Sequence, residues 1–223
     1  MSVKCLKILL GIERITGMNK SDLRLYLVTD RGNLSEQDFL TQIEQAILGG
    51  ATCVQLREKE MSGRSFYQLA LQVKAVTDRY GVPFLINDRL DIALAVDASD
   101  VHLGQSDLPV AVARQILGPN KLVGISAKTV AQALAAQIGG ADYLGVGAMF
   151  PTTTKVITQE TTRETLKVIT ETVKLPVVAI GGISKANSHQ LIGTGITGIA
   201  VVSAIMKSSH PRNVAAELSQ IPF

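Results

Sequence analysis

Residues able to bind phosphate or a metal ion follow short apolar runs at several places along the chain. Arg57 and Lys59 follow one run, Asn87 and Asp88 follow the next, and Asp107 comes after another. Further polar residues and glycines occupy equivalent places, namely Gln55, Gln105, Ser126, the segment 151–155, Gly181, Gly182 and Ser203. Cations beside carboxylates suit Mg²⁺ and a phosphorylated ligand, because Mg²⁺ prefers one or two carboxylates plus substrate phosphate.

The two aspartates have a structural alternative. Asp88 and Asp107 could each cap the N-terminus of a helix, and Pro109 follows Asp107 within what would be the first turn. For a single aspartate, capping is the more common role. Both residues, however, are expected on one rim together with Asn87, and this convergence favours a magnesium site over two caps.

The cations also admit two interpretations. Arg57 and Lys59 alternate at a predicted strand end, so both side chains can point the same way. They could instead form a solvated rim with Glu58 and Glu60. The loop that contains Thr152, Thr153, Thr154 and Lys155 supplies hydroxyls, amides and a cation, although it could be an ordinary turn begun by Pro151.

A second anion site is predicted from glycines and a short helix. Gly181 and Gly182 would let a phosphate approach the backbone, and Ser203 begins a segment whose helical N-terminus would favour an anion. His102 is interpreted as strand-end packing or a secondary contact. The sequence shows no Ser-His-Asp triad and no nucleophilic cysteine, so covalent catalysis is not predicted.

Eight apolar runs must position these residues, at 25–29, 53–56, 84–86, 101–103, 122–125, 143–146, 177–180 and 199–202. Helix-period stripes lie between them, formed by Phe39, Ile43, Ala46 and Ile47, by Phe66, Leu69, Ala70, Val73 and Val76, and by Leu90, Ala93 and Leu94. Helix ends are predicted at Gly49-Gly50, Gly81 and Gly139-Gly140. Eight alternating units predict an α/β fold, one (β/α)₈ TIM barrel, with its active site at the carboxyl ends of the strands. The alternative, an open doubly wound sheet, usually has fewer strands, and no G-x-G-x-x-G follows the first run.

The amino-acid composition argues against several classes of protein. The 223 residues are 46% hydrophobic and carry a formal charge of +3 without a block of Lys and Arg, so no nucleic-acid partner is implied. No segment approaches the about 20 apolar residues of a membrane helix. Cys5 and Cys53 have no metal-ligand spacing and exclude a disulfide framework, which fits a cytoplasmic protein, and Cys53 is expected to be a small buried apolar residue. The sequence leaves open whether the chain forms a homo-oligomer.

The first 17 residues match no barrel element. Lys4 and Lys7 precede a short apolar stretch at 8–12, which Glu13 and Arg14 interrupt before any cleavage site. We interpret residues 1–17 as a dispensable, frayed extension or the result of an early start site. Residues 18–223 are expected to form a single catalytic domain.

The ordered motifs resemble those of the thiamine phosphate synthase family from Leu25 to about Ile205. The resemblance rests on residues 25–30 (LYLVTD), 55–59 (QLREK), 86–89 (INDR), 101–107 (VHLGQSD), 145–155 (GVGAMFPTTTK) and 179–183 (AIGGI). It implies a Mg²⁺-dependent transferase that joins 4-amino-5-hydroxymethyl-2-methylpyrimidine diphosphate to hydroxyethyl-methylthiazole phosphate, or its carboxylated form. The implied products are thiamine phosphate and diphosphate.

The resemblance also implies roles for individual residues. It assigns the pyrimidine diphosphate to Gln55, Leu56, Arg57, Glu58, Lys59, Asn87, Ser126 and Lys155. It assigns Mg²⁺ to Asp88 and Asp107, and the thiazole phosphate to Thr152, Thr154, Gly182, Val202 and Ser203, and we count Thr153 between them as substrate-binding. We expect Arg57, Lys59, Ser126 and Lys155 to contribute most to catalysis.

The sequence departs from the family pattern at one motif, and two alternative functions remain open. The family often has Ser-x-His after the fifth strand, whereas this chain has Ser126-Ala127-Lys128, and Lys128 could add a cation or point to solvent. A thiazole tautomerase on the same barrel would need only the thiazole phosphate site, so the diphosphate and metal residues argue against it. A catalytically silent thiazole phosphate-binding regulator would not need a complete site.

Overall fold

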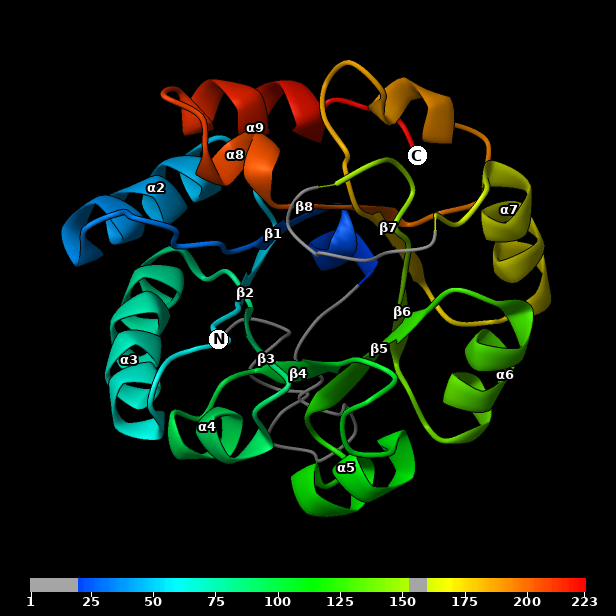
Figure 1. The fold of residues 1–223 in the computed structure, drawn as a ribbon, viewed down its shortest axis with the longest axis horizontal. Helices are drawn as coiled ribbons and strands as arrows, with labels where there is room; N and C mark the ends of the chain where they lie inside the picture. The colour runs from blue at the N-terminus through cyan, green and yellow to red at the C-terminus, as the bar shows by residue number, and fades with distance from the viewer. Residues whose placement is uncertain (1–19, 153–159) are drawn as a thin grey trace, which may run out of the picture.

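The computed structural model describes residues 20–152 and 160–223, in which eight parallel strands close into a barrel (Figure 1). Each strand pairs with its neighbour in sequence, and β1 pairs with β8 to complete the ring. The strands are β1 (Leu25–Val28), β2 (Cys53–Leu56), β3 (Phe84–Asn87), β4 (Asp100–Leu103), β5 (Leu122–Ala127), β6 (Tyr143–Val146), β7 (Val177–Ile180) and β8 (Gly198–Val201). The predicted (β/α)₈ fold is therefore confirmed; β2, β6 and β7 have the predicted bounds, and the ends of the other strands differ by one or two residues.

Helices surround the strands as an outer ring (Figure 1). They are α2 (Glu36–Leu48), α3 (Gly63–Tyr80), α4 (Leu90–Ala95), α5 (Val110–Leu117), α6 (Val130–Ile138), α7 (Arg163–Thr172), α8 (Ser203–Met206) and α9 (Pro211–Ser219), with 3₁₀ turns η1 (Lys20–Leu23) and η2 (Ser188–Leu191). Gly49, Gly81 and Gly139 end helices as predicted. No helix within the described ranges is long and apolar enough to cross a membrane.

The predicted apolar stripes hold for the first two helices and fail in part for α4. All the stripe residues predicted on α2 and α3 are buried. On α4, Leu94 is 44% exposed and Ile92 is buried in its place. The prediction at Leu94 was wrong because α4 has only six residues, less than two turns, which is too short for the spacing of three positions to define its buried face.

The barrel has two cores because successive strand residues face opposite sides. On β1, Leu25 and Leu27 belong to the outer core between strands and helices, whereas Tyr26 and Val28 belong to the inner core inside the barrel. The buried inner core consists of Leu23, Tyr26, Val28, Cys53, Leu85, Tyr143, Val178 and Ala200. Cys53 is fully buried there, as the sequence predicts.

A buried carboxyl group begins β4. The side chain of Asp100 is fully buried, and its Oδ1 accepts a hydrogen bond of 2.6 Å from the Leu122 N–H. Its Oδ2 has no partner among the described residues. Burial, with a smaller contribution from Asp142, raises the pKa of Asp100 to about 7 even though the Leu122 N–H opposes the shift.

This carboxyl group makes stability depend on pH. Because the pKa of Asp100 is higher in the folded than in the unfolded chain, its contribution to the free energy of unfolding is greatest in acid and declines between about pH 4 and pH 7. Asp100→Asn cannot ionise, so we expect it to exceed the wild type in stability at pH 8 by on the order of 1–3 kcal/mol.

Urea unfolding of both proteins at pH 5 and pH 8 measures this effect. The difference between wild type and variant isolates Asp100, because other titrating groups contribute to both proteins. The same stability difference at the two pH values would contradict the assignment.

Candidate active site

A cavity of about 470 Å³ opens at the carboxyl ends of the strands, where the sequence places the active site. It brings together most of the predicted residues, namely Gln55, Arg57, Lys59, Asn87, Asp88, Asp107, Ser126, Thr152, Gly182, Val202 and Ser203. Thr153, Thr154 and Lys155 lie outside the described residues. The cavity draws on all eight strands or the loops after them, so closure of the barrel is what assembles it.

Two predicted residues do not line this cavity. Leu56 is fully buried in the outer core, and Glu58 follows it on the same alternation, whereas Gln55 and Arg57 line the cavity. The Glu58 Oε1 atom is buried and has no hydrogen-bond partner in the described part of the chain. Burial raises the pKa of Glu58, opposed by the nearby Arg31. The side chains of Leu56 and Glu58 therefore lie behind the cavity wall and do not line the cavity.

A cation and two carboxylates meet at the rim between β2, β3 and β4. Lys59 Nζ donates to Asp88 Oδ2, and Asp107 lies within hydrogen-bonding reach of Asp88. Burial acts to raise the pKa of Asp88, but the hydrogen bonds with Lys59 and Asp107 outweigh it and leave the pKa below its ordinary value. Burial and the neighbouring Asp88 raise the pKa of Asp107. The two carboxylates therefore perturb one another, and a divalent cation would relieve their mutual repulsion.

The capping interpretation of the two aspartates is wrong. α4 has Arg89 and α5 has Pro109 at the N-cap, and neither helix receives a side-chain cap hydrogen bond. Asp107 Oδ2 instead accepts a hydrogen bond of 2.7 Å from the Gly104 N–H in the loop after β4. Asp88 has a left-handed backbone with φ of 62°, which turns the chain sharply after β3. Both carboxylates are thus held by loops at the cavity.

Asn87 presents a donor to the cavity. Its side chain is buried, and its Nδ2 has no hydrogen-bond partner within the described ranges. A buried amide donor without a partner costs about 1–3 kcal/mol, so a ligand that accepts its hydrogen bond would recover that energy. That Asn87 contacts a substrate stays a prediction, and this unpartnered donor is the atom that would make the contact.

The opposite side of the cavity carries the predicted glycine turn. Gly182 has φ of 64°, and a Cβ atom there would lie 2.4 Å from the Pro151 carbonyl oxygen and 2.6 Å from that of Phe150. Asn187 Nδ2 donates to the Gly182 carbonyl at 2.9 Å and holds the turn. Only glycine satisfies both the left-handed backbone and the close approach. Val202 and Ser203 line the cavity beside this turn.

Comparison with known proteins decides the family. The sequence profile of thiamine monophosphate synthase matches residues 25–205. The chain belongs to the thiamine monophosphate synthase family. It is 55% identical over 191 residues to thiamine-phosphate synthase 2 of Streptococcus pneumoniae, covering 86% of this chain and 91% of that protein.

Two further relatives agree. The thiamine-phosphate synthase of Clostridium tetani is 50% identical over 198 residues, covering 89% of this chain and 95% of the relative. The solved structure of a thiamine phosphate pyrophosphorylase from Pyrococcus furiosus superposes with a TM-score of 0.82 at 42% identity, covering 91% of this chain and 96% of that one. The family is thus supported by both sequence and fold.

Several further residues of this thiamine monophosphate synthase family member line the cavity, and the family resemblance did not assign them to a substrate or to Mg²⁺. They are Tyr26, His102, Gln105, Lys128 and Tyr143. His102 was interpreted as packing or a secondary contact, and its Nε2 lies 3.0 Å from Oγ of Ser126, a predicted substrate-binding residue. Lys128 is exposed and lines the mouth, so it adds a cation there. The inward register of Tyr26 and Tyr143 is the signal that could have identified them.

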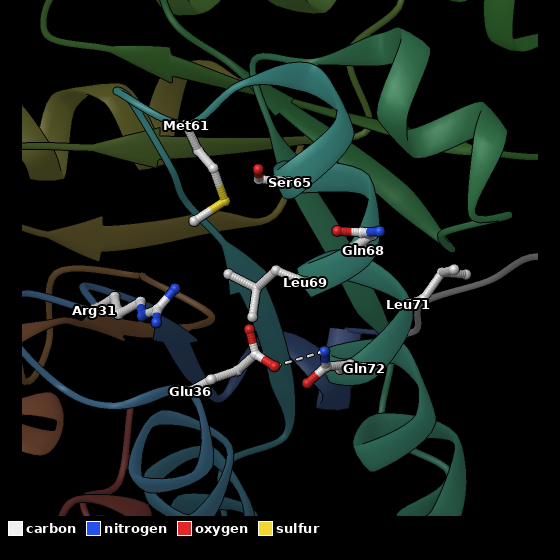
Figure 2. A pocket seen from close by; sticks show the side chains of 8 residues that line it. All are labelled: Arg31, Glu36, Met61, Ser65, Gln68, Leu69, Leu71 and Gln72. Atoms are coloured by element: carbon white, nitrogen blue, oxygen red, sulfur yellow. Dashed lines mark hydrogen bonds between the residues drawn. The ribbon is translucent and has the colours of Figure 1, made fainter.

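A second hollow lies outside the barrel between α2 and α3 (Figure 2). Glu36 and Gln72 point toward one another across it, and Gln72 Nε2 donates to Glu36 Oε1 at 2.8 Å. Arg31 is the one basic side chain among the described residues around it. None of the predicted site residues lies there, so in this family member the strand-end cavity remains the candidate active site.

Proposed function

We propose that this barrel catalyses the thiamine phosphate synthase reaction. It joins the pyrimidine diphosphate to the thiazole phosphate, or to its carboxylated form with loss of CO₂, and releases diphosphate. The observation that carries the proposal is that two separate groups of predicted site residues line one cavity. Lys59, Asp88 and Asp107 meet on one rim, while the Gly182 turn faces the same cavity from β7.

The reaction needs positioning and charge neutralisation more than a protein nucleophile. The bond between the methylene carbon and the diphosphate oxygen breaks, and its electron pair leaves with the diphosphate. The thiazole nitrogen then forms the new bond to that carbon, whose positive charge the electron-rich aminopyrimidine supports. Arg57 and Lys59 counter the growing charge of the leaving group, and Asn87 and Ser126 orient the pyrimidine.

Asp88 and Asp107 would hold Mg²⁺ in this scheme. Their opposite pKa shifts mark two carboxylates that crowd one another, which fits a shared cation. Within residues 20–152 and 160–223 no three His, Cys, Asp or Glu side chains gather into a metal-sized group, so further ligands would come from substrate phosphate and water. When bound, Mg²⁺ would neutralise charge on the diphosphate.

A turnover assay tests the proposal. The purified full chain, supplied with both substrates and Mg²⁺, is expected to form thiamine phosphate and diphosphate in equal amounts. Chelation of Mg²⁺ with EDTA should stop both products, and omission of the pyrimidine diphosphate serves as the control. Isomerisation of the carboxylated thiazole phosphate without condensation would instead identify a tautomerase, and binding without either product would identify a regulator.

A further inference from the structure

A continuous chain of hydrogen bonds lies on the inner wall of the barrel beneath the cavity. Gln55 Nε2 donates to the Tyr26 hydroxyl at 2.7 Å, and the hydroxyls of Tyr26 and Tyr143 lie 2.9 Å apart. The Tyr143 hydroxyl is 3.1 Å from His102 Nδ1, and His102 Nε2 is 3.0 Å from Ser126 Oγ. The chain therefore links β2, β1, β6, β4 and β5 and ends at a predicted catalytic hydroxyl.

Two glycines within strands make room for this chain. A Cβ atom at Gly124 would lie 2.1 Å from Cζ of Tyr143, and one at Gly145 would lie 2.9 Å from Cε1 of His102. Gly124 sits between the two in the sheet, because it pairs with His102 on one side and Tyr143 on the other. Glycine inside a strand weakens it, so the space must serve the side chains that fill it.

The hydrogen bonds run in one direction. Burial raises the pKa of both tyrosines, so each hydroxyl keeps one proton to donate. Tyr26 accepts from Gln55 and therefore donates to Tyr143. Tyr143 then donates to His102 Nδ1, so in the neutral imidazole Nδ1 is the acceptor and the ring proton lies on Nε2. That proton is donated to Ser126 Oγ, so the Ser126 hydroxyl keeps its own proton for the cavity.

We propose that this chain fixes Ser126 as a hydrogen-bond donor to a substrate atom that carries a lone pair and no proton, a ring nitrogen or a phosphate oxygen. Tyr143 and His102 are then positioning residues that act through Ser126. The proposal rests on the proposed function, because the substrate atom belongs to the pyrimidine diphosphate. The opposite direction would bring the proton of Tyr26 against the amide NH₂ of Gln55.

A double-mutant cycle tests whether Tyr143 acts through Ser126. Tyr143→Phe keeps the ring that fills the space at Gly124 but removes the hydroxyl, and we expect it to lower kcat about 10-fold. Ser126→Ala should lower kcat at least as much. The kcat of the double variant should be within about 2-fold of that of Ser126→Ala, because the hydrogen-bond chain then has no Ser126 hydroxyl to orient. Effects that multiply in the double variant, or an unchanged Tyr143→Phe enzyme, would overturn the proposal.

Conservative variants of His102 provide a second readout. The amide of Gln can place its NH₂ near Nε2 and donate to Ser126, whereas Asn reaches only the position of Nδ1. We expect His102→Gln to retain most of kcat and His102→Asn to lose as much as Ser126→Ala. The reverse order, or equal losses, would show a merely structural role.

Two controls separate this proposal from the proposed function. Tyr80→Phe removes an exposed hydroxyl that bonds to Glu44 on the outer helices, so it should leave kcat and KM unchanged. Calorimetric binding of the pyrimidine diphosphate to the single and double variants should show the same non-additivity in Kd without turnover. If the wild-type protein binds this substrate but forms no product, the proposed function is wrong and the hydrogen-bond proposal is not affected. If the enzyme is active but the effects of the two substitutions are additive, the hydrogen-bond proposal is wrong and the proposed function is not affected.

Discussion

Asp88→Asn and Asp107→Asn are each expected to lower kcat by at least about 100-fold while the barrel stays folded. Both carboxylates lie at the rim of the cavity, in contact with one another, and Lys59 donates to Asp88. Neither caps a helix, so the substitutions should not unwind one. Loss of one charge leaves a single carboxylate to hold the cation against the diphosphate.

Asparagine is the informative replacement because of the backbone at Asp88. Its φ of 62° is tolerated by Asn but strained for Ala, which would confuse a folding defect with a metal defect. Asp97 offers a matched control. It has a φ of 51° and is exposed beyond the far end of α4, so Asp97→Asn should keep wild-type kinetics.

Initial rates over a range of Mg²⁺ concentrations measure the effect. The variants should need more Mg²⁺ and still reach a lower plateau, and their melting temperatures should stay close to that of the wild type. If both variants keep near wild-type rates at low Mg²⁺, the two carboxylates are not the metal site.

Gly182→Ala is expected to raise the KM for the thiazole phosphate about 10-fold or more, with a smaller change in kcat. The added Cβ would lie within 2.6 Å of two carbonyl oxygens, so the turn must open where a phosphate would approach the backbone. The thiazole phosphate anchors its substrate and gains no charge during the reaction, so the loss should appear in binding.

Gly81→Ala separates this clash from backbone strain. Gly81 has the same φ of 64°, but a Cβ there would meet nothing within 4 Å, so the variant should keep the wild-type KM. Lys59→Gln supplies the opposite kinetic pattern. Charge grows on the departing diphosphate, so this variant should lower kcat more than it raises the thiazole KM. An unchanged thiazole KM in Gly182→Ala would refute the division of the cavity into two anion-binding sides.

The barrel was predictable because its signals are local. Each strand is a short apolar run, each of the first two stripes spans several turns, and glycines mark helix ends. The rim residues were predictable for a related reason, since residues such as Lys59 and Asp107 follow strands and closure carries all strand ends to one face. Leu94 was not predictable from spacing, because a helix of six residues has no well-defined stripe.

The inner wall was harder to predict. Tyr26 and Tyr143 lie within apolar runs and look like core residues, and only the closed barrel shows that their hydroxyls meet. Whether Asp88 caps a helix also required the structure, because the answer depends on where α4 begins. Leu56 was predicted to contact substrate but belongs to the outer core. A motif shared with a family does not state which side of the strand each of its residues faces.

The glycine at position 124 has a consequence for how this sequence can change over time. Any side chain there would collide with the ring of Tyr143, because an added Cβ atom would lie 2.1 Å from its Cζ. A larger residue at 124 is therefore viable only in a chain that has already lost the bulk of Tyr143. Side-chain size at positions 124 and 143 should therefore change together. Related barrels with a side chain at the equivalent of Gly124 are expected to carry a small residue at the equivalent of Tyr143.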